Sequence, residues 1–234
     1  MSWVAQLPKL NQTEIERNDD FYRDRLRSLQ AVDDLVGQII GRLEEYGILN
    51  NTYIFYSSDN GYHVSQHRLQ PGKKCGFEED INVPLIVRGP GISEGLTANI
   101  ATSHVDLAPT FLNILGIPLR DDFDGSPIPV TADEIAALDS ELHDTREHVQ
   151  VEFWGKDNPN EWGGYACESP RHDGYCKRCI DKLSLADSGF NNTYKSLRVI
   201  GNGYDLYYAV WCTNEHELYD MTVSAQIAAM VYCS

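Results

Sequence analysis

The sequence predicts an α/β fold followed by a smaller C-terminal subdomain built on an antiparallel sheet. Residues 20–115 follow the order helix, strand, strand, helix, which is typical of α/β proteins. Beyond residue 148, short strand-like runs follow one another with brief turns, and this pattern favours an antiparallel sheet. We therefore expect three segments: part of an α/β domain over residues 1–118, a linker with a helical segment over 119–148, and an α+β subdomain with a disulfide-rich loop over 149–234.

The N-terminal part contains one long amphipathic helix and two short strands. Apolar residues recur at spacings of three and four between Asp20 and Tyr46, which is the period of a helix with one apolar face. Gly47 can end that helix. The runs 52–57 and 83–87 predict strands. The first run is β-branched and aromatic without polar alternation, so we expect it to be buried on both faces of a sheet.

A second helix and four further strands complete the predicted elements. Ser103 or Asp106 can cap a helix that extends to about Leu115 and stops at Gly116. The later strands are predicted at residues 149–154, 194–200, 204–211 and 217–219. A long polar stretch from 155 to 189 separates the first of these strands from the rest. A loop of that length needs a stabilising feature, and we expect disulfides drawn from Cys167, Cys176, Cys179 and Cys212, with their pairing left open.

The charge balance argues against two classes of partner. The chain has 234 residues and a mass of 26.4 kDa, with 19 Lys and Arg against 35 Asp and Glu, a formal net charge of −16. Phosphate backbones require a surplus of Lys and Arg, so a nucleic-acid partner is disfavoured, and so is an anionic membrane surface. No apolar run approaches the roughly 20 residues that a membrane-spanning helix needs.

Cysteine content and glycosylation sequons favour an oxidising compartment. The chain has six cysteines, and N-x-[ST] sequons occur at Asn11, Asn50 and Asn191. These features indicate a glycoprotein that is secreted, or extracellular, vacuolar or lysosomal. The N-terminus shows no charged region followed by an apolar one, which a secretory signal would need. We therefore expect that the chain has lost its beginning.

The segment from Asn60 to Phe77 has the composition of an anion-binding loop. It contains five Lys, Arg or His residues and no acid, which reverses the sign of the chain as a whole. Asp59 and Asn60 stand at its start, just after a predicted strand, where ligands bind in open α/β sheets. Their oxygens suit Ca²⁺ or Mg²⁺, and a lysine ammonium suits an anionic oxygen. The alternative interpretation is an Asp-Asn-Gly turn followed by a solvated basic loop.

The run from Tyr53 to Ile92 (YIFYSSDNGYHVSQHRLQPGKKCGFEEDINVPLIVRGPGI) resembles the second signature region of the type I sulfatases, of the arylsulfatase and N-acetylglucosamine-sulfatase kind. The later SHVDLAPTFLNILGI, VEFWG, NNTYKSLRV and HELYDM are similar to the same family. The resemblance covers nearly the whole chain. It implies a partial alkaline-phosphatase-like sulfatase fold and the hydrolysis of a sulfate ester, on a small molecule or a sugar.

The resemblance also implies roles for particular residues. Asp59 and Asn60 match the family's Asp-Asn pair that binds the active-site Ca²⁺. Lys73 stands four residues before Phe77 and matches the lysine that contacts the sulfate, whereas Lys74 fits less well. His63 stands where the DNGYH subgroup has a histidine near the substrate, so it is predicted as catalytic and substrate-binding together with Lys73. His104 and Asp106 belong to a motif that we expect to be mainly structural.

The sequence departs from the family pattern in one important respect. The family's nucleophile is a formylglycine made in a C-x-P-x-R motif before the DNG segment, and the only near match here is Cys167-Glu-Ser-Pro170-Arg171, which follows it. The paired aspartates that would complete the Ca²⁺ site have no counterpart before Asp59. We therefore expect that the chain begins midway through a sulfatase and has no turnover alone. The alternatives are a truncated pseudo-sulfatase without activity, or a phosphatase or phosphodiesterase of the same fold.

Overall fold

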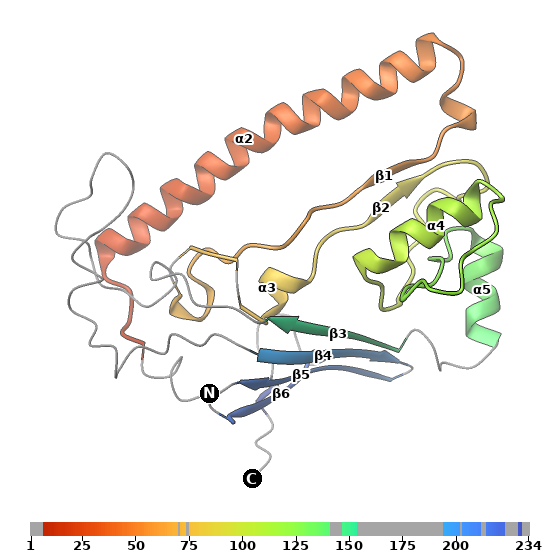
Figure 1. The fold of residues 1–234 in the computed structure, drawn as a ribbon. Helices are drawn as coiled ribbons and strands as arrows, with labels where there is room; N and C mark the ends of the chain where they lie inside the picture. The colour runs from red at the N-terminus through yellow and green to blue at the C-terminus, as the bar shows by residue number, and fades with distance from the viewer. Residues whose placement is uncertain are drawn as a thin grey trace.

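The computed structural model describes residues 7–69, 71–73, 75–140, 147–153, 194–201, 203–211, 214–222 and 229–230. Helix α2 runs along one side of the molecule above the short strands β1 and β2, and the C-terminal sheet lies on the opposite side of helix α3 (Figure 1). Helices α4 and α5 stand together at one end. None of the helices in these ranges is long and apolar enough to cross a membrane.

Helix α2 (Gln12–Glu45) confirms the long amphipathic helix, but it begins eight residues before the predicted start at residue 20. Its N-cap is Asn11, whose side chain accepts a hydrogen bond from the Glu14 amide while the Glu14 carboxylate accepts one from the Asn11 amide. This capping box satisfies two amides that a helix otherwise leaves without partners. Gly47 follows the helix with φ +66°, as expected of a C-terminal stop. No residue of α2 is buried.

Strands β1 (Ile54–Tyr56) and β2 (Ile86–Arg88) form an antiparallel pair in which Phe55 lies opposite Val87. The expectation that the first strand is buried on both faces is wrong, because Ile54 and Phe55 are only half-buried and Tyr56 is exposed. In the described part of the chain these strands pair only with each other, so no further strand covers their edges. Phe55 packs edge-on against Phe111 of α4, with ring centroids 5.0 Å apart.

The chain then forms two helices beyond β2. A 3-10 turn (His104–Asp106) leads into α4 (Leu107–Ile114). Ser103 and Asp106, which the sequence offers as alternative caps, together form a capping box at the start of the 3-10 turn. Gly116 has φ +67° and ends the helix. Helix α5 (Ala132–Ser140) lies within the segment where a helical stretch is expected, although the segment boundaries at 118 and 148 stay a prediction.

The C-terminal antiparallel sheet is confirmed. Its strands are β3 (His148–Phe153), β4 (Tyr194–Gly201), β5 (Tyr204–Trp211), β6 (His216–Asp220) and β7 (Ala229–Met230), hydrogen-bonded in that order. Strands β3 to β6 lie within two residues of their predicted bounds, and β7 was not predicted. Alternate residues of β5 are buried, and they include Tyr207, Ala209 and Trp211.

The main core cluster joins the sheet to the loop before α3 (Glu78–Ile81). It contains the loop residues Leu69, Cys75 and Phe77 and the sheet residues Tyr194 and Trp211, all of them 4% exposed or less. The basic segment is therefore anchored at its far end by apolar packing. The predicted disulfide cysteines lie outside the described residues.

Candidate functional site

The Asp-Asn-Gly turn directly follows β1, as the sequence predicts. Ser58 donates a hydrogen bond from its hydroxyl to the Asn60 carbonyl (2.9 Å), and the Asn60 side-chain amide donates to the Gly61 carbonyl (2.7 Å). These local bonds fix the direction of the Asn60 amide oxygen. Asp59 is exposed and Asn60 is half-buried. The turn therefore presents one carboxylate and one amide oxygen at the end of a strand.

Lys73 returns to this turn from 13 residues further along the chain. Its Nζ lies 3.3 Å from Oδ1 of Asn60, so the lysine ammonium and the amide oxygen are in hydrogen-bond contact. Asp59, Asn60 and Lys73 line one cavity of about 410 Å³, which we call the site cavity. The three residues that the resemblance assigns to metal and sulfate binding thus line the same cavity.

Backbone contacts hold the turn against α3. The Gly61 amide donates to the Asp80 carbonyl (2.9 Å) and the Tyr62 amide to the Glu79 carbonyl (2.7 Å). A Cβ at Gly61 would stand 2.0 Å from the Glu79 oxygen, so only glycine allows this approach. His63 and Gly72 exchange two backbone hydrogen bonds, at 2.9 and 3.1 Å, which join the turn to the segment that carries Lys73.

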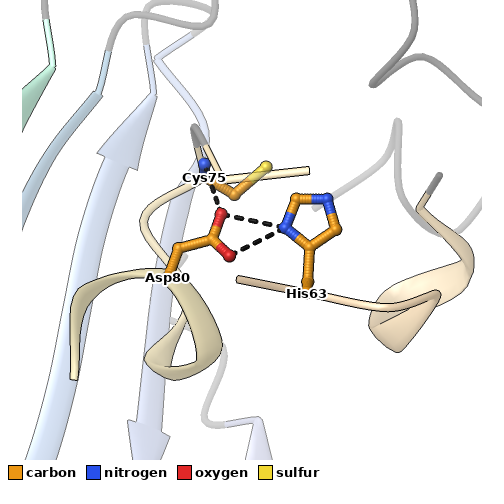
Figure 2. A group of neighbouring side chains, drawn as sticks. All are labelled: His63, Cys75 and Asp80. Carbon is orange, nitrogen blue, oxygen red and sulfur yellow. Dashed lines mark hydrogen bonds and ion pairs between the residues drawn. The ribbon is translucent and has the colours of Figure 1, made fainter. Parts of the chain in front are cut away.

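His63 and Asp80 form a buried pair directly behind these contacts. Nδ1 of His63 lies 2.8 and 2.9 Å from the two carboxylate oxygens of Asp80, and the Cys75 amide donates to Asp80 Oδ2 at 2.7 Å (Figure 2). Because a carboxylate accepts hydrogen bonds, Nδ1 is the donor. The His63 and Asp80 side chains are each 1% exposed. Among the described residues, Nε2 of His63 has no hydrogen-bond partner.

The Cys75, His63 and Asp80 side chains also satisfy the distances of a metal site. One ligand atom from each lies within 4.8 Å of the others, and the described residues contain no other such group of three His, Cys, Asp or Glu. In this arrangement, however, both Asp80 oxygens are bonded to Nδ1, and Oδ2 also accepts from the Cys75 amide. Both oxygens of the Asp80 carboxylate therefore have hydrogen-bond donors within the protein, and these bonds hold two segments together.

Asp59 and Asn60 carry the kind of oxygens that bind a hard cation, but they are too few to complete its coordination. Carboxylate and amide oxygens are the ligands that Ca²⁺ prefers, and the ion takes six to eight of them. Asp59 and Asn60 offer three side-chain oxygens between them, two on the carboxylate and one on the amide. A complete ion site would need further oxygens from other parts of the protein or from water.

The electrostatics of the loop depend on a second histidine. Burial raises the pKa of Glu79, but a hydrogen bond from His67, a backbone hydrogen bond and the charges of His67 and His63 outweigh it, so that the pKa lies below its ordinary value. His67 Nε2 lies 3.5 Å from the Glu79 carboxylate, and its ring stacks on Phe77 with centroids 4.0 Å apart.

The C-terminal sheet supplies contacts that the sequence did not predict. Tyr194 donates a hydrogen bond from its hydroxyl to the Cys75 carbonyl (3.0 Å), and Arg198 donates from Nε to the Glu78 carboxylate (2.7 Å). Burial, followed by the nearby Cys75 and Asp80, raises the pKa of Tyr194, so the phenol keeps the proton that it donates.

Arg198 also contacts Asp205 on the neighbouring strand. Burial lowers the Arg198 pKa, but the Asp205 and Glu78 carboxylates more than compensate and raise it above its ordinary value. The residues of β4 at positions 194, 198 and 200 line the site cavity, with Val149, Val151 and Phe153 of β3. The period of two in a strand was the signal that could have placed these β4 residues on one face.

The remaining predicted residues have mixed outcomes. His63 is not among the residues that line the site cavity, so its contact with substrate stays a prediction, and its observed partner is Asp80. His104 lines the cavity, and Asp106 caps a helix. Asn11 and Asn50 are exposed, and their glycosylation stays a prediction. Lys74, Asn191 and Cys167 lie outside the described residues.

Comparisons with known proteins agree with this fold. The sulfatase family matches residues 5–117. A sulfatase from Metarhizium majus (ppz1) is 43% identical over 225 residues, which cover 96% of this chain and 42% of the relative. An arylsulfatase from Chlamydomonas reinhardtii is 38% identical over 94% of this chain and 32% of the relative. Human N-acetylglucosamine-6-sulfatase is 36% identical, covering 93% of this chain and 38% of the relative.

Solved structures show the same fold. The structure of BT4656 in complex with its substrate D-glucosamine-2-N,6-O-disulfate matches with a TM-score of 0.65 and 24% identity, covering 95% of this chain and 38% of that one. Sulfatases are sulfuric ester hydrolases, and the chain belongs to the sulfatase family. It spans about two fifths of the length of the Metarhizium relative and less of the others described above.

Proposed function

We propose that this chain carries the metal- and sulfate-binding edge of an arylsulfatase-like enzyme that hydrolyses a sulfate ester. Asp59 and Asn60 would bind Ca²⁺, and Lys73 would bind a sulfate oxygen. The observation that carries the proposal is the 3.3 Å contact between Lys73 Nζ and Asn60 Oδ1 at the edge of the site cavity, next to Asp59. This contact brings a positive charge from 13 residues further along the sequence to the turn that carries the carboxylate and amide oxygens. A cation and an anion could then bind side by side.

The chemistry follows from these charges. In sulfate ester hydrolysis an oxygen nucleophile forms a bond to sulfur, the S–O bond to the alcohol breaks, and the alcohol oxygen receives a proton. Negative charge on the sulfate oxygens must be held throughout, and fixed charges aimed at those oxygens stabilise the transition state. A bound cation would supply Lewis-acid stabilisation. The Lys73 ammonium would contact one oxygen directly.

The nucleophile of such an enzyme is not encoded in this sequence, which contains no C-x-P-x-R motif. We therefore propose that the 234-residue chain binds sulfate without turning over a sulfate ester, and that turnover requires a further segment. The six cysteines and the three sequons support a secreted or lysosomal glycoprotein with disulfides.

The test is a calorimetric titration of the chain with inorganic sulfate, in the presence of Ca²⁺ and at low ionic strength. It measures the dissociation constant for sulfate. Lys73→Ala is expected to weaken sulfate binding at least tenfold. The matched control is Lys9→Ala, which removes an exposed lysine that does not line the site cavity and should change the affinity less than twofold. Equal affinity in wild type and Lys73→Ala would overturn the proposal.

A second experiment separates an enzyme from an inactive relative. The coding DNA upstream of Met1 is read for an in-frame C-x-P-x-R motif, and the longer product is assayed with an aryl sulfate and Ca²⁺. Turnover that Lys73→Ala abolishes supports the sulfatase. A longer product without the motif or without turnover would favour the pseudo-sulfatase. Turnover by the 234-residue chain itself would show that the argument about the missing nucleophile is wrong.

A further inference from the structure

We propose that Asp80 and His63 are positioning residues, which set the distance between Asn60 Oδ1 and Lys73 Nζ and thereby the affinity of the site for an oxyanion. This inference rests on the proposed function, because it concerns the same oxyanion. It assigns a role to Asp80, which sequence analysis did not single out, and gives His63 a role that requires no contact with substrate.

The geometry shows that one side chain holds both halves of the site. Asp80 accepts a hydrogen bond from His63, which follows Asn60 by three residues, and another from the amide of Cys75, which follows Lys73 by two. Its backbone carbonyl also accepts from the Gly61 amide. The two segments that meet at the 3.3 Å contact are therefore both bonded to the same residue.

A second connection makes the two segments one unit. His63 and Gly72 exchange a pair of backbone hydrogen bonds, so that each segment is tied to the other as well as to Asp80. A change at Asp80 would release the His63 ring and the Cys75 amide together. Because Gly72 directly precedes Lys73, such a change would shift the lysine with respect to Asn60.

Burial makes this unit stiff. His63 is 1% exposed, Cys75 3% and Asp80 4%. A buried donor that loses its acceptor cannot turn to water, so each lost bond destabilises the folded state. The hydrogen bonds to Asp80 therefore resist opening, and they maintain the distance between Asn60 and Lys73. Lys73 itself is exposed, so the precision of the site has to come from the residues behind it.

The test uses Asp80→Asn, which preserves the volume of the side chain. One amide oxygen can still accept, but an NH₂ group at the other position faces the Nδ1–H donor of His63. At least one of the three bonds to the carboxylate is therefore lost, and the two donors no longer share two acceptor oxygens. We expect sulfate affinity to fall about tenfold. The matched control is Thr110→Val. Thr110 is also 1% exposed and bonds to both Asp106 and Ile128, but its own side chain does not line the site cavity. It should lose stability and keep its affinity within twofold.

A double-mutant cycle distinguishes positioning from general loss of structure. If Asp80 acts through Lys73, the Lys73→Ala/Asp80→Asn double variant should bind sulfate no more than threefold more weakly than Lys73→Ala alone. If the two substitutions instead weaken sulfate binding independently, so that the fold-losses in affinity multiply in the double variant, the inference is overturned. An Asp80→Asn variant whose affinity stays within twofold of wild type would also overturn it.

A measurement without sulfate keeps the inference testable if the proposed function fails. Amide hydrogen exchange at Gly61 to His63 and at Gly72 to Cys75 should accelerate together in Asp80→Asn, and not in Thr110→Val. Absence of sulfate binding by the wild type would refute the proposed function alone. Exchange that stays slow in both segments of Asp80→Asn would refute the positioning role whether or not sulfate binds.

Discussion

The loop from Asp59 to Asp80, which we call the site loop, has a buried inner end and a solvent-facing outer end. These two ends are built in different ways. At the inner end, His63 and Asp80 are nearly inaccessible to water, and the Asp80 carboxylate accepts from both His63 and the Cys75 amide. At the outer end, Asp59 and Lys73 are exposed, and the lysine reaches Asn60 over 3.3 Å. The inner end fixes the shape of the loop, whereas the outer end presents charges to the cavity. Substitutions at the inner end should therefore lower stability and, through the shape of the loop, weaken binding, whereas those at the outer end should weaken binding with little loss of stability.

The largest expected effect of this difference concerns Asp80→Ala. It leaves the His63 Nδ1–H and the Cys75 amide buried without an acceptor, so the free energy of unfolding should fall by about 3 kcal/mol. Urea unfolding at neutral pH measures it. Asp59→Ala at the exposed end is the paired variant and should stay within about 0.5 kcal/mol of wild type. Similar losses in both variants would contradict the distinction between the two ends.

The contact between the loop and the C-terminal sheet comes next. The Arg198 side chain is 14% exposed and contacts Glu78 and Asp205, so Arg198→Met should lower the free energy of unfolding by about 2 kcal/mol. Lys195→Met, on the same strand but 56% exposed, should cost less than about 1 kcal/mol. Chemical denaturation of the two variants under identical conditions makes the comparison. A larger effect at Lys195 would show that the sheet does not brace the loop through Arg198.

A smaller effect with a defined pH dependence is expected at Glu217 of strand β6. Burial raises the pKa of Glu217, outweighing the hydrogen bond from Trp211 that lowers it. The folded protein thus binds this proton more tightly than the unfolded chain, and stability is lost as pH rises above 4.5. Glu217→Gln should be more stable than wild type by about 1 kcal/mol at pH 8. The gain should vanish near pH 4, and a gain that is independent of pH would refute this cause.

The smallest effect has the opposite sign. The pKa of Glu79 lies below its ordinary value of 4.5, so its carboxylate stabilises the folded state above that pH and this contribution is lost as pH falls further. Because Glu79 and His67 are both about 30% exposed, Glu79→Gln should cost only about 0.5 kcal/mol at neutral pH. Thermal unfolding of both proteins between pH 3 and 7 should show the two curves converging at the acid end.

Local signals in the sequence predicted much of this structure. The period of the helix after residue 20, the strand at 204–211 and the Ser103 cap depend on neighbours within a few residues, and all three are found. The Asn11 capping box also depends on a local signal, an Asn followed three residues later by Glu14, but it was not predicted. The prediction that the first strand is buried on both faces was wrong, because the burial of a strand depends on which other elements cover it.

The candidate site could be predicted only in part for the same reason. Asp59 and Asn60 are adjacent in sequence, and the spacing from Lys73 to Phe77 belongs to a recognisable motif. The Asp80 carboxylate and Arg198 could not be assigned, since their roles depend on bonds to His63, Cys75 and Glu78, up to 120 positions away. No local pattern reports such a contact.

The most direct measurement is a sulfate titration of the ¹⁵N-labelled chain with Ca²⁺ present, followed by NMR. We expect the side-chain amide of Asn60 and the backbone amides around Lys73 to shift together, with a single dissociation constant, and we expect Lys73→Ala to remove these shifts. If sulfate leaves both groups unchanged, or shifts them no more than it shifts the surroundings of Lys9, the loop does not bind an oxyanion.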